Sequence, residues 1–130
     1  MRIGIDMMGG DYAPGSVIRG AILARESLPE EVEIVLIGPR DTLTRYSDEH
    51  RLDVSGIAVI NAQNTVGMED HPLKSFREKP DASLFVGHKM LAEGTLDGFC
   101  SAGNTGAMMI GAIQVVTSIP GIIRPAIFGR

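Results

Sequence analysis

The stretch Ser101-Ala102-Gly103-Asn104-Thr105-Gly106 separates an apolar segment, residues 96–100, from the apolar run 107–119. This pattern predicts a strand, a glycine-rich turn and the start of a helix. At such a junction the first helical N–H groups have no partner within the helix, and glycines let the backbone come close to an anion. We therefore expect a phosphate or a carboxylate to bind at this turn.

A second junction of the same kind opens the chain. Residues 2–6 are typical of a strand, and Gly9 and Gly10 lie in a turn, residues 7–14, that precedes a predicted helix. In an open α/β sheet, ligands bind beyond the carboxyl ends of the parallel strands. We predict that the turns after Asp6 and Ser101 lie at the same edge of the sheet and form one shared site.

Composition and charge narrow the class of protein. The 130 residues are 44% hydrophobic and 22% charged, which suits one packed domain and not a membrane protein. The formal net charge of -4 and the absence of a basic stripe argue against a nucleic-acid partner. A single cysteine excludes an internal disulfide and a multi-cysteine metal site, and the polar start of the chain is unlike a secretory signal. We expect a cytoplasmic protein.

Strands and helices alternate along the chain, which predicts an α/β fold with a parallel sheet. The strand segments 33–37 and 57–60 are almost entirely apolar and so require cover on both faces. We therefore expect a three-layer α/β/α arrangement with a mostly parallel, Rossmann-like sheet. The last predicted helix is apolar on most sides and is expected to be central and buried. The predicted strands are 2–7, 31–38, 56–62 and 96–101, the predicted helices are 15–27, 40–50, 82–93 and 104–118, and residues 64–80 are expected to be irregular.

The end of the chain suggests that more protein follows. Residues 118–121 break the last helix, and residues 124–128 look like the start of another strand, yet the sequence stops at Arg130. We expect residues 1–130 to be a single α/β domain, an N-terminal fragment of a longer enzyme with a fold that is incomplete at its C-terminus. The site would then be split between this chain and the part that follows.

Four stretches resemble, in the same order, motifs of the bacterial phosphate acyltransferases. Residues 5–14 are similar to the opening motif "DAMGGDxxP", and residues 68–84 are similar to "EDPxxAxRxKxDSS". Ser101–Ala107 matches "SAGNTGA", and residues 124–126 resemble the start of "RPAL". Any one glycine turn would be a weak signal, but four motifs in order are specific.

The departures from the family pattern are small. Met7 stands where Ala is usual, His71 is inserted before Pro72, and Ala82 stands where the first Ser is usual. The last difference removes a hydroxyl from position 82. Members of the family are two to three times as long as this chain, so the resemblance also implies an amino-terminal portion.

The resemblance implies a reaction of phospholipid synthesis. Inorganic phosphate attacks the thioester of a long-chain acyl group carried on acyl carrier protein, and acyl phosphate and free carrier are formed. It implies a fold like that of isocitrate and isopropylmalate dehydrogenases, and neither a cofactor nor a metal is expected. It further implies a cytoplasmic homodimer that associates peripherally with the membrane and works with the next acyltransferase of the pathway, without a nucleic-acid partner.

The candidate site residues follow from the motif positions. A phosphate dianion is already a nucleophile, so the enzyme has to position it and stabilise the oxyanion that forms. Asp6 and Asn104 are the candidate catalytic residues, and we expect Asn104 to lie in an exposed loop. The free-energy cost of desolvating an ion exceeds the stabilisation that a helix dipole provides, so binding of phosphate also requires cationic side chains. The candidates for binding phosphate or substrate are Gly9, Gly10, Asp11, Lys74, Arg77, Lys79, Ser83, Gly103, Thr105 and Gly106.

Structural roles remain open for several of these residues. Asp6 could equally hydrogen-bond the backbone of the first glycine turn, and Asp11 could cap the next helix. Gly103 and Gly106 could simply permit a tight strand-to-helix turn, and each of the cations Lys74, Arg77 and Lys79 could be a solvated surface charge. Cys100 is expected to be a small core residue and not a nucleophile, because no cationic partner is evident.

Two other functions compete with the acyl-carrier-dependent reaction. One is a phosphotransacetylase that acts on coenzyme A thioesters, which would share the phosphate and thioester chemistry. The other is a module that binds phosphate or a carrier protein without turnover. The preference for acyl carrier protein or coenzyme A would distinguish the first alternative from the acyl-carrier-dependent enzyme. An assay of this chain beside the complete protein would distinguish the second.

Overall fold

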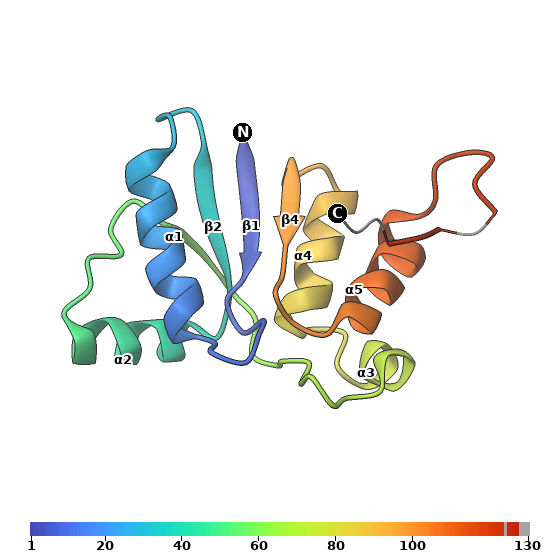
Figure 1. The fold of residues 1–130 in the computed structure, drawn as a ribbon, viewed down its shortest axis with the longest axis horizontal. Helices are drawn as coiled ribbons and strands as arrows, with labels where there is room; N and C mark the ends of the chain where they lie inside the picture. Colours follow the sequence, from blue (N-terminus) through green and yellow to red (C-terminus); the bar gives the residue numbers. More distant parts are fainter. Residues whose placement is uncertain (124, 128–130) are drawn as a thin grey trace.

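The computed structural model describes residues 1–123 and 125–127 (Figure 1). The four strands expected between residues 2 and 101 are present, each somewhat shorter than expected, and a helix lies at each of the four expected helical positions. In chain order the elements are β1 (Arg2–Asp6), α1 (Gly15–Ser27), β2 (Glu33–Gly38), α2 (Arg40–His50), β3 (Ala58–Asn61), α3 (Pro72–Glu78), α4 (Ser83–Ala92), β4 (Gly98–Cys100), α5 (Thr105–Gly111) and a π-helical turn, η1 (Ala112–Val116).

The four strands form one parallel sheet in the order β3-β2-β1-β4. Strand β1 lies between β2 and β4, and its residue Ile5 pairs with Cys100 at the end of β4. The two strands run in the same direction and end at neighbouring positions. The turns that follow them therefore leave from the same edge of the sheet, as the sequence predicts.

Helices cover both faces of this sheet (Figure 1). On one face, Ile34 and Leu36 of β2 belong to the same buried cluster as Ile18 of α1. On the other face, Val35 and Ile37 share a cluster with residues of α4 and with Leu96. The nearly continuous apolar sequence of β2 is explained by this cover, because alternate side chains enter two different cores.

One prediction for the middle of the chain is wrong. Residues 64–80 are expected to be irregular, but α3 occupies Pro72–Glu78. Pro72 stands at the first helical position. An N–H at this position makes no hydrogen bond within the helix, so proline, which lacks the N–H, is well suited to it. Phe76 anchors the helix by an edge-to-face contact with Phe85 of α4, with ring centroids 5.2 Å apart. Pro72 could have indicated from the sequence that a helix begins at this position.

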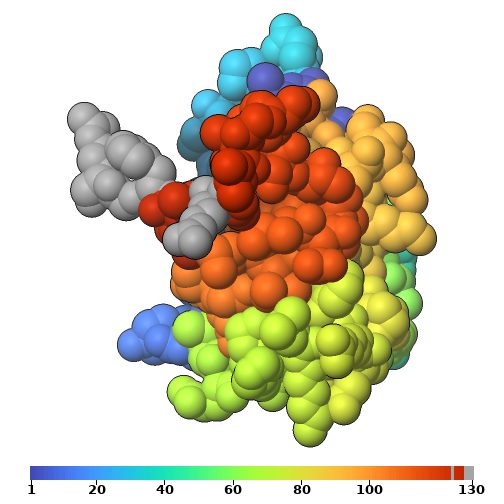
Figure 2. Space-filling view, turned by 90° about the vertical axis from the view of Figure 1, so that its right-hand side faces the viewer, coloured from blue at the N-terminus to red at the C-terminus, as the bar shows by residue number. Residues whose placement is uncertain are grey.

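The last predicted helix is not a single buried helix. It continues from α5 into η1, and Thr117 then adopts a left-handed φ of 73° that ends it. Among its residues Ala107 and Gly111 are buried, and η1 has no buried residue. Figure 2 shows α5 and the segment after it lying open on this face, above α3. The apolar sequence of this helix therefore covers α4 on one side only.

The strand expected over residues 124–128 is not formed within its described part, because Pro125–Ile127 have no strand pairing. Arg124 and Phe128 lie outside the described residues. Within residues 1–123 and 125–127, no helix is both long enough and apolar enough to cross a membrane.

Candidate functional site

The two glycine turns touch each other at the carboxyl edge of the sheet. A Cβ built on Gly9 would lie 2.5 Å from Ser101 Oγ and 3.0 Å from the amide nitrogen of Gly103. A Cβ on Gly103 would in turn lie 3.1 Å from the Cα of Gly9. Only glycine allows two backbones to approach this closely. The structure thus brings the first and second predicted turns into one place.

Gly10 and Asp11 complete the first turn in different ways. Gly10 has a φ of 103°, a conformation that L side chains rarely adopt, and it packs against Ala102 of the second turn. Asp11 is exposed, and the residue at the N-cap of α1 is Pro14 with no side-chain cap. The alternative reading of Asp11 as a helix cap is therefore wrong.

The buried carboxylate of Asp6 connects three parts of the fold by hydrogen bonds. Its side chain is almost fully buried, with the residue 3% exposed, at the end of β1. One carboxylate oxygen, Oδ1, accepts hydrogen bonds from the Ser83 hydroxyl at 2.6 Å and from the Met8 amide at 3.2 Å. The other, Oδ2, accepts from the Ser101 hydroxyl at 2.7 Å. The carboxylate thus ties β1 to α4 and to the second turn.

Ser101 was not among the candidate residues. Its Oγ accepts a hydrogen bond from the Gly103 amide at 3.0 Å while it donates to Asp6. The signal that could have found it is a hydroxyl at the end of a strand that is parallel to the strand of Asp6. The Gly103 amide is engaged here, whereas the amides of Thr105 and Gly106 stand at the first two positions of α5, where an N–H has no acceptor within the helix.

Asn104 lies at the centre of a clamp, and the expectation of an exposed loop is wrong for it. The residue is only 7% exposed. Its Oδ1 accepts from the Ala107 amide at 3.0 Å and so caps α5. Its Nδ2 donates to three carbonyl oxygens, those of Gly67, Met68 and Asp70, at 3.0–3.1 Å. Both ends of the amide are thus occupied, and the side chain fastens the segment before α3 to the second turn.

Lys79 is held by the same segment. Its Nζ lies 2.6 Å from Asp70 Oδ2 and 3.2 Å from the carbonyl oxygen of Thr65. The hydrogen bond from Lys79 is the main cause that lowers the pKa of Asp70, and the amide of Gly67 contributes in the same direction. The ammonium group therefore serves to fix the 65–70 segment in this structure.

The other two candidate cations lie on the outer side of α3. Lys74 makes a loose contact of 4.0 Å with Glu78 one turn further along, and both side chains are well exposed. Arg77 is exposed as well and borders a shallow groove that it shares with His71 and Leu73. The residues that line this groove are not those of the second turn. In the described part of the chain, no hydrogen bond or ion pair joins Lys74 or Arg77 to the glycine turns.

Cys100 lies close enough to Asp6 for the carboxylate charge to affect the pKa of its thiol. Cys100 is exposed as a residue, because β4 is an edge strand, so the expectation of a core position is wrong. Its sulfur nevertheless lies 3.5 Å from the Gly4 carbonyl oxygen, and burial together with the charge of Asp6 raises the pKa of the thiol. A thiol with a raised pKa is a poor nucleophile at neutral pH.

His88 is a buried residue of α4 that packs against α5. Its Nδ1 lies 2.8 Å from the Leu84 carbonyl oxygen, and the ring fills the space that a side chain at Gly111 would need. Burial lowers the pKa of the imidazole, although the Leu84 and Met108 carbonyls and Asp6 act in the opposite direction. Within the described part of the chain, no three His, Cys, Asp or Glu side chains gather as a metal site would require.

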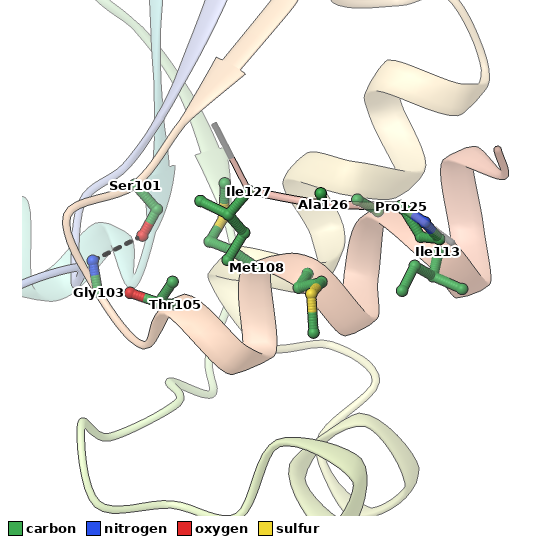
Figure 3. Close-up of a pocket in the computed structure, with 10 residues that line it drawn as sticks. Ser101, Gly103, Thr105, Met108, Ile113, Pro125, Ala126 and Ile127 are labelled. Carbon is green, nitrogen blue, oxygen red and sulfur yellow. Dashed lines mark hydrogen bonds between the residues drawn. The ribbon is translucent and has the colours of Figure 1, made fainter. Parts of the chain in front are cut away.

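An apolar groove of about 360 Å³ opens beside the second turn. Figure 3 shows Ser101, Gly103 and Thr105 at one end and the side chains of Met108 and Ile113 further along it. Its remaining lining residues are Met109, Ala112 and residues 125–127. The groove therefore has a polar end at the glycine turn and an apolar body along α5 and η1.

Comparisons with known proteins agree on one family. The family described as "Fatty acid synthesis protein" matches residues 1–129. The chain is 42% identical over 127 residues to a phosphate acyltransferase of Thermoanaerobacterium thermosaccharolyticum, covering 98% of this chain and 36% of that relative. It is 42% identical over 127 residues to a phosphate acyltransferase of Thermotoga neapolitana, covering 98% and 35%, and 40% identical over 130 residues to one of Caldicellulosiruptor bescii, covering 100% and 39%. The chain thus spans less than two fifths of the length of these relatives.

Proposed function

The chain belongs to the fatty acid synthesis protein family, and we propose that the complete protein is a phosphate acyltransferase that makes acyl phosphate from inorganic phosphate and a long-chain acyl thioester of acyl carrier protein. The proposal is supported by the names of the relatives, each a phosphate acyltransferase. It is also supported by the motifs at the two turns. The observation that carries it is the direct contact of Gly9 with Gly103 beside an apolar groove.

The site offers the two environments that this reaction needs. The second turn supplies the amides of Thr105 and Gly106, which have no acceptor within α5, and the exposed Thr105 side chain, which suit an anion. The groove supplies an apolar surface along Met108 and Ile113, which suits an acyl chain. Phosphate at the turn and the chain in the groove would place the thioester carbonyl between them.

The chemistry then requires no protein nucleophile. A phosphate oxygen attacks the thioester carbonyl carbon, and a carbon–oxygen bond forms as the carbonyl becomes an oxyanion. The oxyanion collapses, the carbon–sulfur bond breaks, and the carrier leaves as a thiolate that takes up a proton from water. The protein contributes by holding the two reactants together and by donating hydrogen bonds to the oxyanion.

Among the candidate cations, Arg77 is the one we carry forward as a phosphate-binding residue. Lys79 is committed to Asp70, and Lys74 faces Glu78. A guanidinium can bind two phosphate oxygens at once. Because Arg77 lies on the outer side of α3, this role requires its long side chain to turn toward the glycine turns when phosphate binds.

Further features rest on the family membership. We propose that the fold is a three-layer α/β/α arrangement like that of isocitrate and isopropylmalate dehydrogenases, of which residues 1–130 form an N-terminal domain. We also propose a cytoplasmic homodimer that contacts the membrane peripherally and supplies the next acyltransferase of the pathway.

The test is an assay of acyl phosphate, trapped as its hydroxamate, with the complete protein, inorganic phosphate and a long-chain acyl thioester. Product from the acyl-carrier thioester at a much higher kcat/KM than from the coenzyme A thioester is the expected result. The reverse preference would support a phosphotransacetylase. The 130-residue chain assayed alone is expected to be nearly inactive, and robust turnover by it would overturn the split site.

A further inference from the structure

The hydroxyl of Ser101 connects the buried carboxylate of Asp6 to the glycine turn. A hydroxyl has a single proton, and a carboxylate can only accept, so the proton of Ser101 points at Asp6 Oδ2, 2.7 Å away. This leaves a lone pair of Oγ to accept from the Gly103 amide at 3.0 Å. The direction of the hydroxyl, and with it the position of Gly103, is therefore set by the charge on Asp6.

The carboxylate has little left to offer a substrate. Its second oxygen already accepts from Ser83 and Met8, and the residue is 3% exposed. Each donor comes from a different part of the chain, so the carboxylate fixes one end of β1, of α4 and of the second turn at once. A buried polar group with all its partners in place serves to specify one geometry.

We propose that Asp6 and Ser101 are positioning residues, and that the Asp6 carboxylate acts through the Ser101 hydroxyl to hold the turn 101–106 in the shape that binds the anion. This inference rests on the proposed function for the identity of that anion, and it replaces a direct catalytic role for Asp6. An Asn side chain at position 6 would keep its Oδ1 as the acceptor for the Met8 amide and so turn its Nδ2 toward Ser101. The Ser101 hydroxyl would then accept from that Nδ2 and its proton would lose its fixed acceptor, so the direction from which the hydroxyl accepts from Gly103 would no longer be set.

A double-mutant cycle on the complete protein tests the coupling. Asp6→Asn and Ser101→Ala are each expected to raise the phosphate KM about tenfold, as the loss of one hydrogen bond would do. The KM for the acyl thioester is expected to stay within about twofold, because the apolar body of the groove along Met108 and Ile113 is untouched. The double variant is expected to match either single variant, since within the described residues the Ser101 hydroxyl makes the hydrogen bond that joins the Asp6 carboxylate to the turn 101–106.

The control for a general loss of stability is Ser47→Ala. Ser47 is also a buried serine whose hydroxyl makes one hydrogen bond, to the Leu43 carbonyl oxygen, and it lies in α2, which contributes no residue to either turn. It is expected to leave both KM values as they are. A phosphate KM that is multiplied again in the double variant, by about a hundredfold in total, would overturn the proposal, and so would single variants with a normal phosphate KM.

A second measurement separates this inference from the proposed function. Amide hydrogen exchange of Gly103, followed by NMR in the protein without substrate, is expected to be protected in the wild type and faster in both Asp6→Asn and Ser101→Ala. Unchanged protection in Ser101→Ala would overturn the inference even if Asp6→Asn failed to fold. If the wild type forms no acyl phosphate, the proposed function fails while the exchange result still decides whether Asp6 holds the turn.

Discussion

The Cα of Gly9 lies 3.1 Å from the point that a Cβ of Gly103 would occupy, although the two residues belong to turns at opposite ends of the sequence. Parallel pairing of β1 with β4 creates this contact, because both strands end at the same edge. The contact leaves no room for a methyl group on Gly9, and a methyl group on Gly103 would require its neighbours to shift by a few tenths of an ångström. The shape of the site therefore depends on two glycines that make no polar contact with one another.

The first prediction concerns Gly9→Ala. The added Cβ would lie 2.5 Å from Ser101 Oγ and 2.9 Å from Asp6 Oδ2, so the turns must separate. We expect a loss of about 1–3 kcal/mol in the free energy of unfolding, measured by chemical denaturation, and a large fall in acyl phosphate formation. Gly20→Ala is the matched control. Gly20 is exposed within α1 with nothing within 4 Å of its Cβ position, so this change should stabilise the fold by about 0.5–1 kcal/mol.

The second prediction concerns Asn104→Ala. The loss of the N-cap alone costs about 1 kcal/mol, and three carbonyl groups of the 67–70 segment lose their donor as well. We expect a clear drop in the free energy of unfolding together with lower turnover. Asn64→Ala removes an exposed side-chain amide that donates to Asp81, its one side-chain partner among the described residues, and should stay within about 0.5 kcal/mol of wild type. Equal stability of the two variants would contradict the clamp.

The contrast between these two sites shows what the sequence could predict. The meeting of Gly9 with Gly103 follows from strand, turn and helix patterns, because the pattern of a parallel sheet dictates where strands end. The partners of Asn104 could not be predicted, because they are backbone carbonyls of a segment more than thirty residues away. That segment is a loop, and no periodic sequence pattern indicates the path of a loop. Asp6 and Ser83 were found by motif alone, and their hydrogen bond depends on how α4 packs across the sheet edge.

The third prediction concerns Arg77, the candidate phosphate-binding residue of α3. Arg77→Ala is expected to raise the phosphate KM about tenfold with little change in the acyl thioester KM, as loss of a charge-assisted contact would do. Arg45→Ala, an exposed arginine on α2, should change neither value. Equal effects on both substrates would argue against a phosphate contact for Arg77.

The fourth prediction concerns Lys79, which should act on acid stability. The pKa of Asp70 is lowered chiefly by Lys79, so the stabilisation is present above the ordinary value of 3.8 and is lost as the pH falls through the lowered pKa. In Lys79→Ala this part of the pH dependence should be smaller. Unfolding curves recorded across the acidic range would show it, and wild-type acid sensitivity in the variant would contradict the role of the ion pair.

The last prediction places the acyl chain. Ala112 lines the apolar groove, whereas Gln114 is exposed in the same helical turn and does not line it. A Trp side chain at position 112 would fill the groove, so Ala112→Trp should lower kcat/KM for a long-chain acyl thioester by about tenfold or more and spare a short-chain one. Gln114→Trp adds the same side chain outside the groove and should affect neither substrate. Steady-state kinetics with both chain lengths provide the measurement. An equal loss for the two chain lengths in Ala112→Trp would mean that the chain does not lie along α5 and η1.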